Sequence, residues 1–312
     1  MRRPLKLTLR IFLLLFIFMN MIVIFHAYKF THYYNQGEVT IKKQSDKTGW
    51  DISRELFFGF NAVKQINSVP DRIYKTIYLT TNDGLKLEAW VTTNPAANGT
   101  VAMFHGHGGK KSGILKEAAS FREMGYNTLL LDFRAHGSSE GNTCTIGYDE
   151  AEDVKLAYEY LQTKGEKNIV LWGISLGAAT ITKAVNDYAI APQKIILEMP
   201  FGSLPEAVVG VVKKMGLPPQ PLSTLLTFWG GVEHGFWAFN VKPSEYVKQL
   251  RCPVLLQHGS KDPRVTNTET KEIFDNITTT KKWVEYTGSA HESLCTNEHE
   301  KWVTEVSAFL QK

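Results

Sequence analysis

Two stretches of the sequence match G-x-S-x-G, a pattern that places a nucleophilic serine on a sharp turn between a strand and a helix. They are GSSEG at 137–141 and GISLG at 173–177. The turn needs an apolar strand that ends abruptly, a helix that starts at once, and glycines that let the two approach closely. Ser175 meets these demands, because it lies between IVLWG and the helix-like LGAATITKAV. Ser139 is followed by the loop NTCTIG, so we predict that Ser175 is the nucleophile and that 137–141 is a loop.

A serine nucleophile needs a base that accepts its proton and an acid that orients this base. Asp262 follows the apolar strand-like run CPVLLQHG, and His291 follows the next such run, KKWVEYTG. The carboxyl ends of parallel strands meet at one edge of a sheet, where sites of this kind assemble. Taken singly, each could be a turn-forming aspartate or a surface histidine. The order Ser175, Asp262, His291 predicts a catalytic triad.

The oxyanion of an acyl-transfer reaction needs backbone N–H donors. We expect one from Leu176, which follows the nucleophile, and one from His107 in the loop HGHGG, with Gly108 as the next choice for the second donor. A phosphate-binding loop aligned on Gly109 lacks the first glycine and the final hydroxyl residue of its pattern. A metal site built on His105 and His107 lacks a nearby third ligand, so the sequence predicts no metal.

From Thr100 onward, continuous apolar runs alternate with helix-like segments, which indicates a mostly parallel sheet with helices on both faces. The segment around Asn82-Asp83-Gly84 predicts an antiparallel hairpin at one edge. Residues 201–250 break this alternation and predict a cap or lid. The aromatic side chains of this cap could line an acyl pocket, face lipid or pack within the cap: Phe228, Trp229, Phe236, Trp237 and Phe239.

The N-terminus combines a basic segment, 1–10, with an apolar run from Ile11 to Tyr28. The run is near the lower length limit for a membrane-spanning helix, and no A-x-A-like cleavage site follows it. An uncleaved signal anchor therefore fits better than a cleaved signal peptide. The basic excess before the run predicts a cytoplasmic N-terminus and a catalytic domain on the other side of the membrane. We expect a connector at 29–74 and the catalytic domain at 75–312.

The net charge of +4 arises at this N-terminus. Without the five basic residues that precede Glu38, 30 of the 35 basic residues remain against 31 acidic residues. The body is thus near neutral, which gives no argument for nucleic-acid binding. The cysteines Cys144, Cys252 and Cys295 form no disulfide framework and no zinc pattern, although one pair could bond outside the cytoplasm.

The ordered segments FHGHGG, LDFRAHGSSEG, LWGISLG, QHGSKD and GSAHESL resemble those of α/β-hydrolases, most closely the esterase and serine-aminopeptidase-type branch. The resemblance covers roughly residues 75–312. It implies an eight-stranded, mostly parallel sheet, a serine triad and no required cofactor, and it makes 132–141 a loop beside the site. The acid loop departs from the D-x-x-V-P pattern, because Asp262-Pro263-Arg264-Val265 is followed by Thr266.

Together these features predict a membrane-anchored serine hydrolase that cleaves a small-molecule or lipid-like acyl ester. The same triad could serve a peptidase, a thioesterase, or a lysophospholipase or acyltransferase. A non-catalytic binding protein with this fold is the remaining alternative, and the complete set of three residues argues against it.

Overall fold

A mixed β-sheet forms the centre of the computed structural model, which describes residues 2–70 and 73–311. Within these ranges the sheet has eight strands in the order β10-β9-β8-β7-β5-β6-β4-β3. All neighbours run parallel except β4, which is antiparallel to β3 and β6. This confirms the predicted α/β sheet and its edge hairpin. The strands are β3 (Lys75–Thr80), β4 (Lys86–Val91), β5 (Thr100–Phe104), β6 (Asn127–Leu131), β7 (Ile169–Ile174), β8 (Lys194–Glu198), β9 (Val254–Gly259) and β10 (Lys281–Tyr286).

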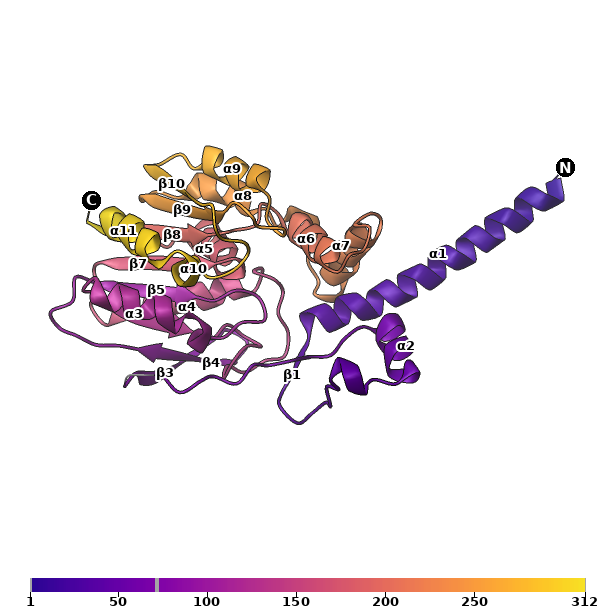
Figure 1. Ribbon diagram of the computed structural model, residues 1–312, viewed down its shortest axis with the longest axis horizontal. Coiled ribbons are helices and arrows are strands. Elements are labelled where there is room, and N and C mark those ends of the chain that lie inside the picture. The colour runs from indigo at the N-terminus through magenta and orange to yellow at the C-terminus, as the bar shows by residue number, and fades with distance from the viewer. Residues whose placement is uncertain (1, 71–72, 312) are drawn as a thin grey trace.

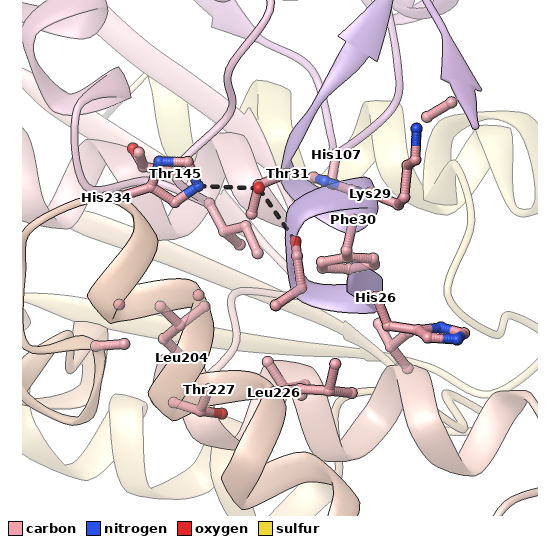
Figure 2. A pocket seen from close by; sticks show the side chains of 18 of the residues that line it. His26, Lys29, Phe30, Thr31, His107, Thr145, Leu204, Leu226, Thr227 and His234 are labelled. Carbon is pink, nitrogen blue, oxygen red and sulfur yellow. Dashed lines mark hydrogen bonds between the residues drawn. The ribbon is translucent and has the colours of Figure 1, made fainter. Parts of the chain in front are cut away.

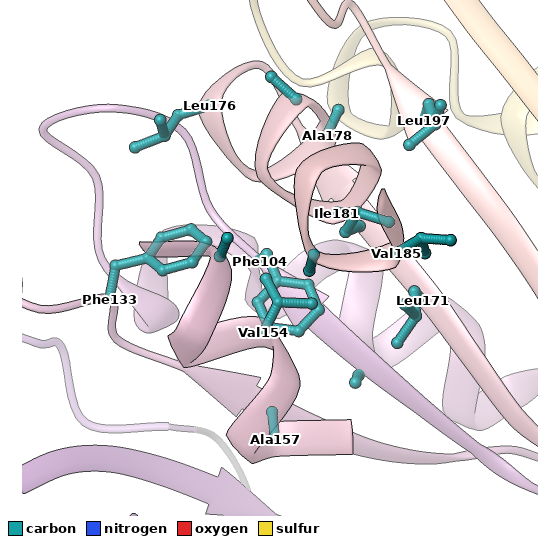
Figure 3. Packing of buried hydrophobic residues seen from close by; sticks show 14 of the residues in the cluster. Phe104, Phe133, Val154, Ala157, Leu171, Leu176, Ala178, Ile181, Val185 and Leu197 are labelled. Atoms are coloured by element: carbon teal, nitrogen blue, oxygen red, sulfur yellow. The ribbon is translucent and has the colours of Figure 1, made fainter. Parts of the chain in front are cut away.

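The central strands are mostly apolar because both faces of the sheet are covered by helices. Along β5, Val101 and Met103 belong to one buried cluster, whereas Ala102 and Phe104 belong to the other. Helices α4 (Glu150–Thr163), α5 (Leu176–Tyr188) and α9 (Asn267–Asn276) pack on the Phe104 face, part of which is drawn in Figure 3. The opposite face is covered by α3 (Leu115–Glu123), α10 (Leu294–Asn297) and α11 (His299–Leu310).

The predicted cap at 201–250 contains two long helices, α6 (Leu204–Lys214) and α7 (Leu222–Glu233), which pack against each other. They stand beside the sheet on the side from which α1 projects (Figure 1). The short helix α8 (Pro243–Tyr246) instead packs against α5 and α9. The last part of the predicted cap therefore belongs to the body of the domain.

Helix α1 (Arg2–Thr31) is longer than the predicted span and projects away from the sheet (Figure 1). Its apolar side chains from Leu7 to Phe18 are exposed, and the segment Lys6–Thr31 is long and apolar enough to cross a membrane. The C-terminal half contacts α7 and α2 (Gly49–Phe58). One apolar helix near an N-terminus is a candidate anchor and no more.

The predicted connector folds back onto the domain. Strand β1 (Tyr33–Tyr34) pairs in parallel with β2 (Ala62–Val63), and a capping box between Thr48 and Asp51 starts α2. Short 3₁₀ turns lie at Gln44–Asp46, Lys111–Ile114, Ala238–Asn240 and Val247–Gln249. Asp71 and Arg72 of the predicted connector, Met1 of the basic segment and Lys312 of the predicted domain lie outside the described residues.

Candidate active site

Ser175 lies on the sharp turn between β7 and α5, with φ 53° and ψ −112°. A Cβ on Gly173 would come within 2.5 Å of the backbone of Gly177, and one on Gly177 within 2.2 Å of the Phe104 carbonyl oxygen. The two glycines therefore allow the helix to start directly above the sheet. Leu176 begins α5, and the N–H groups of a first helical turn have no partner within the helix.

The structure brings the three predicted triad residues together. His291 Nε2 lies 2.9 Å from Ser175 Oγ, and His291 Nδ1 lies 2.6 Å from Asp262 Oδ2. Asp262 follows β9 and His291 follows β10, so both lie at the carboxyl edge where β7 also ends. This is the arrangement in which an imidazole can take a proton from the hydroxyl while the carboxylate orients its ring.

The environment of Asp262 favours its ionised form. Burial raises the pKa of this carboxyl, but the interactions with His291 and the backbone N–H groups of Val265 and Arg264 together outweigh burial, and the net pKa is lowered. The other oxygen, Oδ1, accepts the N–H groups of Arg264 (2.8 Å) and Val265 (3.0 Å). Backbone donors and His291 thus hold the carboxylate in one orientation.

The loop after β5 runs directly beside Ser175, since a Cβ on Gly106 would lie 3.6 Å from Cβ of Ser175. The N–H of Gly108 donates to Nε2 of His136 at 3.0 Å. Among the described residues, no hydrogen bond uses the N–H of His107. Of the two donors considered from the sequence, His107 is therefore the available one, while Gly108 is already engaged.

The His107 ring is enclosed by the N-terminal segment. It stacks on Phe30 with 5.0 Å between ring centroids, and its Nε2 lies 3.1 Å from the Tyr33 hydroxyl. Burial, followed by the positive charge of Arg264 and the proximity of His105, lowers the pKa of His107 to about 4. The ring is thus neutral near pH 7. In this state Nε2 can either accept a hydrogen bond from the Tyr33 hydroxyl or donate one to it, depending on the tautomer.

Two neighbouring cavities lie on this side of the domain, and the smaller one adjoins the serine. A small one of about 60 Å³ is lined by Ser175, His291 and Arg264. A larger one of about 310 Å³ lies between the last turns of α1 and helices α6 and α7 (Figure 2). Five side chains line both cavities: Phe30, His107, Ile146, Val208 and Val211.

Comparisons with known proteins agree with this geometry. Residues 95–229 match the serine aminopeptidase S33 family. An esterase of Pyrococcus furiosus superposes with a TM-score of 0.66 at 21% identity, over 80% of this chain and 97% of the esterase. The uncharacterized protein YqkD of Bacillus subtilis is 24% identical over 75% of this chain and 77% of its own length. The lysophosphatidylserine lipase ABHD12 of Danio rerio is 26% identical over 56% of this chain, and less than half of that lipase, 46%, is matched.

The chain has the α/β-hydrolase fold. In this fold the second G-x-S-x-G motif has a structural role. Ser139 is buried, its Oγ donates to the Asp132 carbonyl at 2.6 Å, and it accepts the N–H of Glu88 at 2.9 Å. These bonds tie the loop after β6 to strand β4. No helix follows Ser139 directly, in agreement with the prediction of a loop.

The aromatic residues of the cap need a correction. Of the four predicted pocket residues, Phe236 lines the larger cavity, whereas Phe228, Trp229 and Trp237 do not. Trp229 donates to Oδ1 of Asn20 on α1 at 2.9 Å, and Phe228 lies edge-on to both tryptophan rings. Trp237 is half exposed. The physical reason is that the cavity is lined from α7 by Leu226, Thr227, Gly230 and Gly231, while Trp229 on the same helix is directed to α1 and Trp237 lies beyond the end of α7.

Several residues at the site were not singled out by sequence reasoning. Phe30 and Tyr33 reach it from the predicted connector, and Arg264 belongs to the acid loop that departs from the family pattern. His136 lies in the segment LDFRAHGSSEG, which resembles the family, but the sequence indicates no role for its side chain. The described residues contain no group of three or more metal-ligating side chains, and they contain the three cysteines as free, buried thiols.

Proposed function

We propose that this protein is a membrane-anchored serine hydrolase that cleaves carboxylic esters through an acyl-enzyme. The observation that carries the proposal is the position of His291, within hydrogen-bond distance of both Ser175 and Asp262. The matched serine aminopeptidase family and the esterase neighbour support the same reaction class.

In the proposed reaction, Ser175 Oγ attacks the ester carbonyl carbon and His291 Nε2 takes the hydroxyl proton. The N–H groups of His107 and Leu176 bind the developing oxyanion, each worth on the order of a hundredfold in rate. The tetrahedral intermediate then breaks the bond to the alcohol, which leaves with the proton from His291. Water, deprotonated by His291, attacks the acyl-enzyme and releases the carboxylic acid together with free Ser175.

Peptide, thioester and lysophospholipid substrates use the same steps. The apolar chamber behind Phe30 and His107 supports an acyl ester over a peptide, because a peptide backbone would leave polar groups unpaired there. Arg264 supports an anionic alcohol as the leaving group, since it lines the cavity of Ser175 and has no ion-pair partner among the described residues. The similarity to a lysophosphatidylserine lipase agrees with such a substrate.

We further propose that α1 anchors the protein with its N-terminus in the cytoplasm and the catalytic domain on the opposite side. The exposed apolar half of α1 and the basic residues before it support this orientation. A protease added outside intact cells should digest the catalytic domain. If the catalytic domain resists the protease until the membrane is opened on the cytoplasmic side, the proposed topology is wrong.

The serine assignment is tested with two matched variants, Ser175→Ala and Ser139→Ala. Ser175→Ala should lower kcat for p-nitrophenyl esters by about a millionfold. Ser139→Ala should keep ester hydrolysis and lower stability by about 1–3 kcal/mol, because it leaves the buried N–H of Glu88 unpaired. The opposite pattern contradicts the assignment. A folded wild-type protein that neither hydrolyses esters nor reacts with a fluorophosphonate would support the binding-protein alternative.

A further inference from the structure

The larger cavity is formed partly by α1, the same helix that is proposed to anchor the protein in the membrane. Its walls include Ala27 and Phe30 of α1, Val208 and Val212 of α6, and Leu226 of α7. Figure 2 shows the last turns of α1 facing α7 across this space. Two hydrogen bonds fix the helices against each other, from Trp229 Nε1 to Asn20 Oδ1 (2.9 Å) and between His234 Nε2 and Thr31 Oγ1 (2.9 Å). The position of α1 therefore determines the shape of the chamber.

The lining of the chamber suits a hydrocarbon chain. Three of its polar side chains have partners within the protein: His234 bonds to Thr31, His26 Nε2 lies 2.9 Å from the Leu56 carbonyl, and Lys29 donates to the Tyr34 hydroxyl at 2.6 Å. In Figure 2 the Lys29 ammonium points away from the space between Phe30 and Leu226. A charged headgroup would be buried here without a partner, which is costly, whereas an acyl chain would lose only contact with water.

The chamber lies between the cavity of Ser175 and a second cavity beside α2. It shares Phe30 and His107 with the cavity of Ser175. On the other side it shares Lys29, Phe60 and Asn61 with a cavity that is also lined by Trp50 of α2. Trp50 is 76% exposed, and the α2 rings of Phe57 and Phe58 contact Phe18 and Phe25 on α1. Exposed aromatic residues beside a membrane helix are typical of the membrane interface.

We propose that the last turns of α1, together with α6 and α7, form the acyl-chain site of the enzyme, and that its substrates are esters of long-chain fatty acids drawn from the membrane. This inference rests on the proposed esterase function and specifies its substrate class. The ester carbonyl lies at Ser175, the chain passes between Phe30 and Val211, and the chamber holds its distal part. Phe30 at the end of α1 and Tyr33 of β1 also contact His107, so both elements support the loop that is proposed to bind the oxyanion.

The test uses the full-length protein in detergent micelles and compares kcat/KM for p-nitrophenyl acetate and p-nitrophenyl laurate. Ala27→Phe places a ring in the chamber, since Ala27 lines it and is only 3% exposed. Laurate turnover should fall at least about tenfold, because the ring displaces several methylene groups from their site. Acetate turnover should stay within about twofold. The matched control is Leu14→Phe on the same helix, where Leu14 is 66% exposed, and it should change neither value.

A second variant keeps the test valid if Ala27→Phe does not fold. Gly230 lines the chamber from α7, and a Cβ there meets no atom within 4 Å. Gly230→Leu should therefore fold and reduce laurate turnover selectively. If folded variants keep the wild-type ratio of laurate to acetate, or lose both substrates equally, the acyl-chain site is wrong. If the wild type hydrolyses neither ester, the proposed function itself fails.

Discussion

At the scale of single residues, Arg264 lines the cavity of Ser175. It belongs to the acid loop, in which the sequence departs from the family pattern. Its backbone N–H holds Asp262, and its charge contributes to lowering the pKa of His107. Its side chain has no ion-pair partner among the described residues, so it is available to a substrate. A guanidinium binds phosphate and carboxylate groups through paired donors.

We expect Arg264→Gln to lower kcat/KM for a lysophospholipid with a net negative headgroup by about tenfold relative to a monoacylglycerol of the same chain. A hydrogen bond to a charged group contributes about 1.5–3 kcal/mol, and about 1.4 kcal/mol corresponds to a factor of ten. Arg264→Lys, which keeps the charge, should recover part of the loss. Equal losses for the two substrates would show that Arg264 only shapes the acid loop.

At the scale of secondary-structure elements, the junction between β7 and α5 depends on how closely the helix approaches the sheet. Gly177 has no room for a Cβ, because the Phe104 carbonyl oxygen would lie 2.2 Å from it. Gly230 is also inside a helix, but its Cβ direction is open. Both glycines lie within helices, but only Gly177 is required by close packing.

Gly177→Ala should displace α5, reduce ester hydrolysis by at least about a hundredfold and lower the melting temperature, because a small misplacement of reacting groups is costly. Gly230→Ala should leave acetate hydrolysis unchanged and stabilise the protein by up to about 1 kcal/mol, the propensity difference between glycine and alanine. Thermal unfolding and acetate kinetics check both. An active, stable Gly177→Ala protein would contradict the described packing.

The elements of the sheet were predictable from sequence because fully buried strands leave continuous apolar runs. The runs after 100, 127, 167, 194, 252 and 281 all correspond to strands. The proximity of Ser175, Asp262 and His291 was predictable for the same reason, since each of them follows the end of such a run. The cavity was not, because it depends on how α1 and α7 pack, and an apolar run such as 11–28 has the same pattern whether it faces lipid or protein. Trp229 pairs with Asn20 across 209 positions of sequence, which no local pattern indicates.

At the scale of the whole molecule, buried acids couple stability to pH. Glu198 lies in the core at the end of β8, where its Oε1 accepts hydrogen bonds from Trp302 (2.6 Å), Trp172 (2.8 Å) and Gln257 (3.1 Å). Burial nevertheless dominates and raises the pKa of Glu198 to about 8, from 4.5 for an exposed glutamate. The folded protein thus keeps a proton that the unfolded chain releases above about pH 4.5.

The free energy of unfolding should therefore fall as pH rises from about 4.5 to 8, by at most about 1.4 kcal/mol per pH unit from this group, and level off above pH 8. Glu198→Gln cannot release a proton, so it removes this contribution. The measurement is the difference in unfolding free energy between Glu198→Gln and wild type at pH 5, 6, 7 and 8. We expect the variant to gain relative to wild type across the series. A difference that does not change with pH would show that Glu198 is ionised in the folded protein.

The proposed mechanism depends on Ser175 being the nucleophile, and covalent labelling identifies the reactive residue. Wild-type protein is treated with a fluorophosphonate, and the modified residue is mapped by mass spectrometry of its peptides. We predict one phosphonyl group per chain on Ser175, no labelling of Ser175→Ala, and undiminished labelling of Ser139→Ala. Modification at Ser139, or equal labelling of the Ser175→Ala protein, would contradict the account.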